Sequence, residues 1–145
     1  MYIALRVVIG SIFLVSGLGK LLGPYQNFMY VIQAYQLLPS WAELLVAQFF
    51  PWAELIIGVF VLLGFWMPWS LRAAAVLFGV FVVVVGQALI RGLPLENCGC
   101  FGEWVHFKPQ MIIVLDSISL GLTLALLRRH KELKKFSLDD YFDKA

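Results

Sequence analysis

Charged side chains are scarce in this chain of 145 residues. Asp, Glu, Lys and Arg together make up 14% of it, whereas hydrophobic residues make up 61%, and the mean hydropathy is +0.87. An ordinary soluble domain carries about 25% charged residues, which keep its surface in contact with water. The shortage of charge therefore excludes a soluble globular protein and predicts an integral membrane protein.

Several motifs that would indicate a function are also missing. The chain has no phosphate-binding glycine loop, no zinc-protease helix and no nucleophile elbow. Two cysteines are too few for a four-cysteine iron–sulfur cluster, and there is no Cys-x-x-Cys-His sequence for covalent haem. The net charge is only +2, and the basic residues gather at one end without interleaved aromatics, which argues against nucleic acid as a partner.

Four apolar segments are long enough to cross a membrane, because a spanning helix needs about 20 apolar residues. They cover about residues 3–22, 41–65, 71–90 and 109–127. The first lacks a small-residue cleavage site and is longer than the core of a signal peptide, so we expect it to be retained as a helix. The sequence predicts an all-α, four-helix transmembrane bundle that forms a single domain over residues 1–145.

The segment between the first two spans, residues 24–40, mixes aromatic and apolar residues with glutamines. It is too polar to span the membrane and too apolar for free solution. We expect an interfacial or re-entrant helix that ends at Pro39, with its aromatic side chains at the depth of the lipid headgroups.

The orientation follows from the basic residues of the tail, 128–145. Five Lys and Arg residues lie close together directly after the fourth span, and the positive-inside rule places them in the cytoplasm. Four spans then place both termini in the cytoplasm. The connection between the third and fourth spans is predicted to face the extracytoplasmic side of a bacterial inner membrane.

That connection contains the two cysteines of the chain, Cys98 and Cys100, separated by Gly99. A disulfide needs Cα atoms about 4.4–6.8 Å apart, which this spacing allows only in a bent backbone such as glycine permits. The resulting small ring is strained and readily reduced, and an exposed, strained disulfide suits exchange with another thiol protein. Cys98 and Cys100 are therefore the candidate catalytic residues.

Three interpretations of the cysteines stay open. In the first, they exchange thiol and disulfide with an extracytoplasmic thioredoxin-like protein, and quinone or another membrane carrier takes or supplies the electrons. In the second, they form a local staple in a non-catalytic subunit or assembly factor of a larger membrane complex. In the third, Cys98, Cys100 and His106 bind zinc or copper, although a fourth ligand other than Glu103 is not obvious.

Four ionisable residues are expected within or at the ends of the spans: Lys20, Glu54, Arg91 and Asp116. Their charges sum to zero, and an isolated charge in a bilayer costs several kcal/mol, so we expect them to pair. The predicted pairs are Lys20 with Glu54 and Arg91 with Asp116. These pairs either fix the helix register or handle protons, and all four residues are candidates for binding a quinone head group.

Small residues recur in the first three spans and predict close contact between helices. The glycines concerned are Gly10, Gly17, Gly19, Gly58, Gly64, Gly79 and Gly86. An alternative for Gly17 and Gly19, which lie just before Lys20, is that they leave room for the head group of a cofactor.

An ordered set of short motifs resembles the methylamine-utilisation MauE family within the wider DoxX-like group. The resemblance covers nearly the whole chain and implies a four-helix inner-membrane protein associated with redox maturation of exported proteins. In that family, MauE works beside the thioredoxin-like MauD to mature the disulfide-rich small subunit of methylamine dehydrogenase. The motifs are Ser16-Gly17-Leu18-Gly19-Lys20, Tyr35 with Leu37-Leu38-Pro39, Pro51-Trp52-Ala53-Glu54-Leu55 with Gly58, Arg91-Gly92, and Cys98-Gly99-Cys100-Phe101-Gly102.

Overall fold

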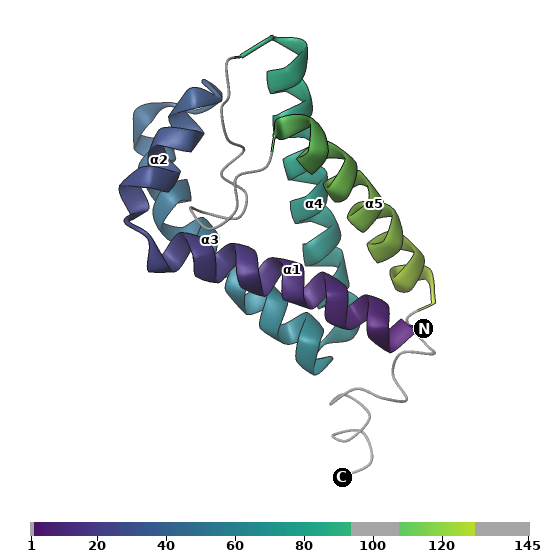
Figure 1. Cartoon of the computed structure of the whole chain (residues 1–145). Helices are drawn as coiled ribbons and strands as arrows, with labels where there is room; N and C mark the ends of the chain where they lie inside the picture. Colours follow the sequence, from purple (N-terminus) through teal and green to yellow (C-terminus); the bar gives the residue numbers. More distant parts are fainter. Residues whose placement is uncertain (1, 94–107, 130–145) are drawn as a thin grey trace.

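The computed structural model describes residues 2–93 and 108–129, and within these ranges the chain forms helices that are joined by short turns (Figure 1). Four of its five helices are long and apolar enough to cross a membrane. The helices are α1 (Tyr2–Leu22), α2 (Tyr25–Ala34), α3 (Ser40–Leu63), α4 (Met67–Ile90) and α5 (Pro109–Arg128). The predicted all-α class with four membrane-spanning helices is confirmed.

The turn between α3 and α4 explains why the helix ends differ slightly from those expected. Gly64 ends α3 with a φ of 71°, a left-handed conformation that glycine adopts without strain. Pro68 then lies in the first turn of α4, where its missing N–H is not needed, so α4 begins at Met67 rather than near residue 71. The Ser70 hydroxyl donates a hydrogen bond to the Phe65 carbonyl across this turn, at 2.7 Å.

The predicted extra helix between the first two spans is present as α2, but it ends at Ala34 and not at Pro39. The chain leaves the helical conformation at Gln36, whose φ of 51° is left-handed. The 10 residues of α2 extend about 15 Å, which is half of the hydrocarbon thickness of a bilayer. It packs mainly against α3, as Figure 1 shows. Its length rules out a further membrane span, and its position at the membrane surface stays a prediction.

The helices associate mainly in two pairs, α1 with α3 and α4 with α5. The α1–α3 contact is antiparallel and close: a Cβ added at Gly17 would lie 2.8 Å from the Leu55 nitrogen, and one at Gly58 would lie 2.8 Å from the Leu14 nitrogen. The expectation of glycine-mediated packing is thus confirmed for Gly17 and Gly58, and α3 backbone fills the space that was considered for a cofactor beside Gly17. It is wrong for Gly79, where an added Cβ would meet nothing within 4 Å.

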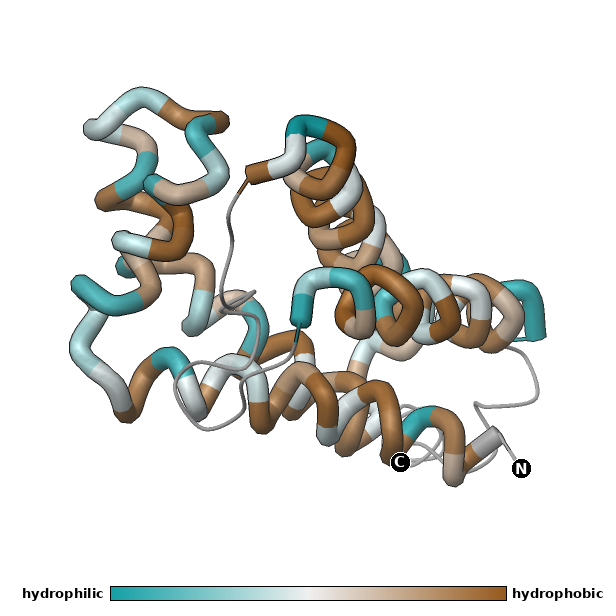
Figure 2. Tube along the Cα trace, turned by 45° about the horizontal axis from the view of Figure 1, so that its top comes forward, coloured by the Kyte–Doolittle hydropathy of each residue, from teal (hydrophilic) through white to brown (hydrophobic). Residues whose placement is uncertain are grey.

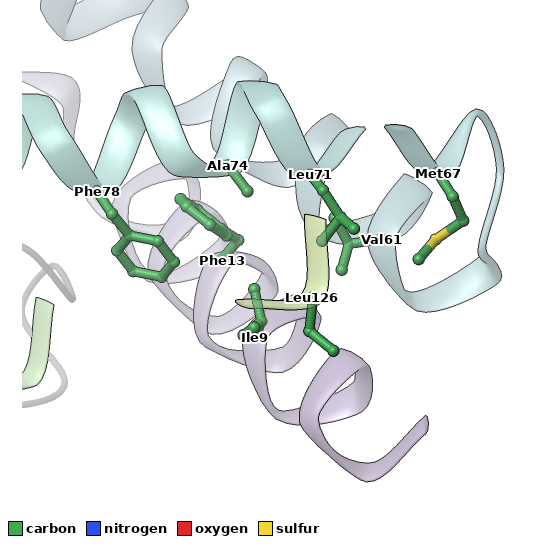
Figure 3. Packing of buried hydrophobic residues seen from close by; sticks show 8 residues of the cluster. All are labelled: Ile9, Phe13, Val61, Met67, Leu71, Ala74, Phe78 and Leu126. Atoms are coloured by element: carbon green, nitrogen blue, oxygen red, sulfur yellow. The ribbon is translucent and has the colours of Figure 1, made fainter. Parts of the chain in front are cut away.

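A cluster of buried apolar side chains joins the two pairs of helices (Figure 3). Within it, the ring centroids of Phe13 on α1 and Phe78 on α4 lie 4.6 Å apart. The start of α1, the end of α3, the start of α4 and the end of α5 therefore meet at one end of the bundle. The cluster consists of Ile9, Phe13, Val61, Met67, Leu71, Ala74, Phe78 and Leu126.

The long helices also expose apolar side chains over much of their outer surface. Figure 2 shows them as mostly hydrophobic, with hydrophilic residues mainly near their ends and in α2. Val83 on α4 and Ile118 on α5, for example, are 69% and 58% exposed. Lipid chains are the natural cover for such surfaces, and the chain is a multi-pass membrane protein.

Candidate functional site

The centre of the site is a buried ion pair between α1 and α3. The Lys20 ammonium lies 2.7 Å from Oε2 and 2.9 Å from Oε1 of Glu54, and both side chains are fully buried. Lys20 also donates a hydrogen bond to the Ser16 hydroxyl at 2.8 Å, and that hydroxyl donates to Glu54 Oε1 at 3.2 Å. The predicted Lys20–Glu54 pair is confirmed, and Ser16 completes a closed hydrogen-bonded triangle.

Local sequence brings these three groups together. Ser16 and Lys20 are four residues apart, so they lie on the same face of α1. Gly17 lies between them and lets α1 approach α3 closely, at Leu55, which follows Glu54. The close contact of the two backbones therefore places Glu54 within direct reach of both Ser16 and Lys20.

Three phenylalanine rings surround the ammonium of Lys20. Its nitrogen lies 5.1 Å from the ring centroid of Phe28, 5.9 Å from that of Phe50 and 5.4 Å from that of Phe81. These rings come from α2, α3 and α4. Because aromatic faces attract cations, and more strongly away from water, the cage stabilises the charged form of Lys20 without adding a hydrogen bond.

The same three rings form one wall of an apolar cavity between α2, α3 and α4. The cavity has a volume of about 270 Å³ and is partly open. Its other walls are aliphatic apart from Tyr35. A neutral, lipophilic molecule fits this lining, whereas a charged head group does not. The aliphatic lining residues are Val31, Ile32, Leu37, Leu38, Val46, Val80, Val84 and Val85.

A second carboxyl group, that of Asp116 on α5, faces the ion pair from the other side. Asp116 is 4% exposed and shares a small cavity, of about 10 Å³, with Ser16 and Glu54. Among the residues that the structure describes, its Oδ2 has no hydrogen-bond partner. The buried polar group of the bundle therefore contains Ser16, Lys20, Glu54 and Asp116.

The predicted pair of Arg91 with Asp116 is wrong. Arg91 caps the end of α4, is exposed, and donates a hydrogen bond to Gln87 Oε1 at 3.2 Å. Asp116 lies two turns inside α5 and faces Ser16 and Glu54 instead. The pair was predicted only from the opposite charges and the similar depth of the two residues in the membrane. The face of α5 that carries Asp116 is instead turned toward Ser16 and Glu54.

Tyr35 lies just beyond α2 and connects it to α4 and α5. It packs against Val85, Ala88 and Ile112 and is 6% exposed. Burial is the main reason why the pKa of the Tyr35 phenol is raised to about 12. The phenol is therefore neutral at physiological pH and lies near the buried polar group.

Sequence reasoning missed several members of the site. Ser16 could have been predicted, because a hydroxyl four residues before a lysine on a helix is placed to accept a hydrogen bond from its ammonium. Phe28, Phe50 and Phe81 come from three helices, and no local pattern marks them as a cage. Arg6 and Glu43, each 8% exposed, are further buried charges that were missed near the ends of the spans.

Cys98, Cys100, Glu103 and His106 lie outside the described residues, so their roles stay predictions. Within residues 2–93 and 108–129, no group of three or more His, Cys, Asp or Glu side chains is arranged to hold a metal ion. Lys20, Glu54 and Asp116 come together in the buried group, and Arg91 is separate from them.

The fold and the buried site define a multi-pass membrane protein with four spanning helices and an ion pair in its interior. The chain belongs to the MauE family: the family model described as methylamine utilisation protein MauE matches residues 1–129.

Curated relatives agree with this assignment. The methylamine utilization protein MauE of Paracoccus denitrificans is 30% identical over 125 residues, which cover 85% of this chain and 66% of the relative. The MauE protein of Paracoccus versutus is 34% identical over 128 residues, which cover 85% of this chain and 68% of the relative. The MauE protein of Methylorubrum extorquens is 28% identical over 97 residues, which cover 67% of this chain and 52% of the relative. The aligned region thus spans about half to two thirds of these relatives. No solved structure matches the chain.

Proposed function

We propose that this protein exchanges thiol and disulfide through Cys98 and Cys100 with an extracytoplasmic thioredoxin-like protein, in the maturation of exported proteins. The observation that carries the proposal is where α4 ends and where α5 begins. Because α4 and α5 pack side by side in opposite directions, α4 ends and α5 begins at the same end. The connection that contains Cys98 and Cys100 leaves and re-enters the bundle at that end.

The charge distribution supports an extracytoplasmic location for this end. At the opposite end of the bundle, four arginines lie near the start of α1, the start of α4 and the end of α5, namely Arg6, Arg72, Arg128 and Arg129. The Arg72 guanidinium there lies 5.0 Å from the ring of Trp69, which is 66% exposed, as in an interfacial anchor. By the positive-inside rule, this distribution supports a cytoplasmic location for the arginine end.

The proposed exchange transfers two electrons and two protons and needs no metal ion. When the Cys98–Cys100 dithiol is oxidised to a disulfide, two electrons and two protons pass to an acceptor. The acceptor is either the disulfide of the partner protein, which becomes a dithiol, or a quinone, which becomes a quinol. The reverse direction oxidises the partner instead.

A quinone would find a suitable environment in the apolar cavity between α2, α3 and α4. Its volume of about 270 Å³ suits one substituted ring, and the rings of Phe28, Phe50 and Phe81 offer flat apolar surfaces. The buried Lys20–Glu54 pair would then lie behind these rings rather than in contact with the ligand. Within the described residues, this cavity supports a quinone site better than Arg91, whose exposed side chain lies at the end of α4 and is not part of the cavity lining.

Trapping of mixed disulfides tests the exchange reaction. The chain contains only two cysteines, so Cys98→Ser and Cys100→Ser each leave one thiol, and the double variant is a control without any. One single variant should accumulate a covalent complex with a thioredoxin-like protein that reductant releases. If neither variant forms such a complex, and cells with the double variant still mature exported disulfide proteins normally, the protein is instead a non-catalytic subunit or assembly factor.

The orientation has its own test in the cysteine-free double variant. A single cysteine is introduced at Lys108, an exposed position before α5, or at Arg129, an exposed position after it. A membrane-impermeant thiol reagent should label the cysteine at position 108 in intact cells and the one at 129 only after lysis. The reverse pattern would contradict the proposed topology.

A further inference from the structure

The charges in the buried polar group do not balance if every group is ionised. Lys20 contributes one positive charge, whereas Glu54 and Asp116 would contribute two negative charges. The other buried charges among the described residues are distant along their helices. At 1.5 Å per residue, Arg6 lies ten residues, or about 15 Å, before Ser16, and Glu43 lies eleven residues, or about 16 Å, before Glu54. The group therefore has one negative charge in excess, in a region that lipid surrounds.

The hydrogen bonds show which carboxyl group lacks compensation. An ammonium has three N–H donors, and those of Lys20 are directed at the two oxygens of Glu54 and at Ser16. Ser16 in turn donates its proton to Glu54. Asp116 receives none of these donors, and its Oδ2 is without a partner among the described residues.

Among the described residues, no cation other than Lys20 lies close to Asp116. From α1 it faces Ile12, Phe13 and Ser16, from α3 it faces Glu54, and from α4 it faces Phe78 and Phe81. Within residues 2–93 and 108–129, Tyr35 after α2 is the remaining titratable group close enough to interact with it. A bare carboxylate here would forgo several kcal/mol of hydration without replacement, which buried ionised groups rarely do.

We propose that Asp116 is the proton-binding site of the bundle, protonated while Lys20 is paired with Glu54. The proton is shared: it moves from Asp116 to Glu54 when Lys20 turns from Glu54 to Asp116, and the sum of charges on the three groups stays zero in both arrangements. The small cavity that Asp116 and Glu54 share has room for about one water, which suffices to carry a proton between them. This inference does not depend on the cysteines or on the proposed thiol exchange.

The geometry favours a proton over a metal cation as the bound species. Cations such as Ca²⁺ and Mg²⁺ need about six or more oxygen ligands, some of them water. The cavity of about 10 Å³ is too small for an ion with such a shell, and Glu54 and Ser16 already use their oxygens in the triangle with Lys20. A proton needs only one carboxyl oxygen, such as Oδ2 of Asp116.

Infrared spectroscopy of the full-length protein in lipid vesicles tests the proposal, because a protonated carboxyl group has a carbonyl stretch distinct from that of a carboxylate. At neutral pH the protein should show one such band that shifts in D₂O, and Asp116→Asn should remove it. Glu43→Gln, which changes another buried acid outside the group, should leave the band in place. Absence of the band from the unaltered protein, which requires no variant to fold, would overturn the proposal, as would its persistence in Asp116→Asn.

Glu54→Gln distinguishes a shared proton from an Asp116 that is protonated simply because it is buried. With Glu54 neutral, Lys20 has Asp116 as its nearest acid, and the proposal requires Asp116 to lose its proton and pair with Lys20. The band should therefore disappear although Asp116 is intact. If the band remains in folded Glu54→Gln, the two carboxyl groups do not share the proton and the proposal is wrong.

Discussion

Lys20 and Glu54 form an ion pair that is withdrawn from the protein surface, with 2.7 Å between the ammonium nitrogen and Glu54 Oε2. The pair links α1 to α3 at the level where Gly17 brings their backbones into contact. Breaking a buried pair from one side leaves an uncompensated charge, which typically costs about 3–5 kcal/mol.

We expect substitution of Lys20 to destabilise the protein more than substitution of Glu54. Lys20→Met removes the only cation of the buried group and should lower the free energy of unfolding by about 3–5 kcal/mol. Glu54→Gln should cost less, because Asp116 can then serve as the partner of Lys20. The double variant should recover much of the loss of Lys20→Met, as measured by denaturant unfolding in detergent.

Lys108→Met is the matched control for these measurements, because Lys108 is exposed before α5 and should tolerate the change within about 0.5 kcal/mol. If the effects of Lys20→Met and Glu54→Gln simply add in the double variant, the two residues are not energetically coupled.

The glycines of the α1–α3 contact make a second prediction. Gly58→Ala places a Cβ 2.8 Å from the Leu14 backbone nitrogen, which cannot move without shifting α1. We expect a loss of about 1–3 kcal/mol in unfolding free energy. Gly79→Ala, where nothing lies within 4 Å, should be neutral or stabilising by up to about 1 kcal/mol, because alanine favours a helix. Equal effects at the two sites would contradict the close contact of α1 with α3.

A comparison of the structure with the predictions made from the sequence shows how much of the fold is a local property of the chain. The four spans and the presence of a helix between the first two follow from hydrophobic length and pattern, because each is a local property of the chain. The end of that helix at Ala34 did not follow from the sequence, which had placed it at Pro39. The Lys20–Glu54 pair was also predictable, since a membrane charge requires a partner. The position of Asp116 was not, because it depends on the rotation of α5 against α1 and α3, and the Phe28–Phe50–Phe81 cage depends on three helices meeting in space.

Tyr35 predicts how stability changes at high pH. Burial is the main reason why its pKa is raised to about 12, compared with about 10 in an unfolded chain. The fold thus favours the neutral phenol, so its contribution to stability is complete below about pH 10 and is lost as the pH rises toward 12. The contribution lost amounts to about 2–3 kcal/mol, because each tenfold change in the ionisation equilibrium corresponds to about 1.36 kcal/mol.

Comparison with Tyr35→Phe isolates this contribution, because phenylalanine fills the same space and does not ionise. Thermal unfolding should show the unaltered protein losing stability between about pH 10 and 12 more steeply than the variant. Parallel pH profiles of the two proteins would show that the phenol of Tyr35 is not buried as the structure places it.

The proposed thiol exchange depends on the redox potential of Cys98 and Cys100, and a redox titration of the purified protein in vesicles measures it most directly. The two thiols are alkylated at each potential with a reagent that adds mass, and the fraction modified is read by mass spectrometry. We predict a two-electron midpoint between about −120 and −270 mV, the range of proteins that exchange disulfides. A midpoint well below about −300 mV, typical of a permanent structural disulfide, would contradict the account.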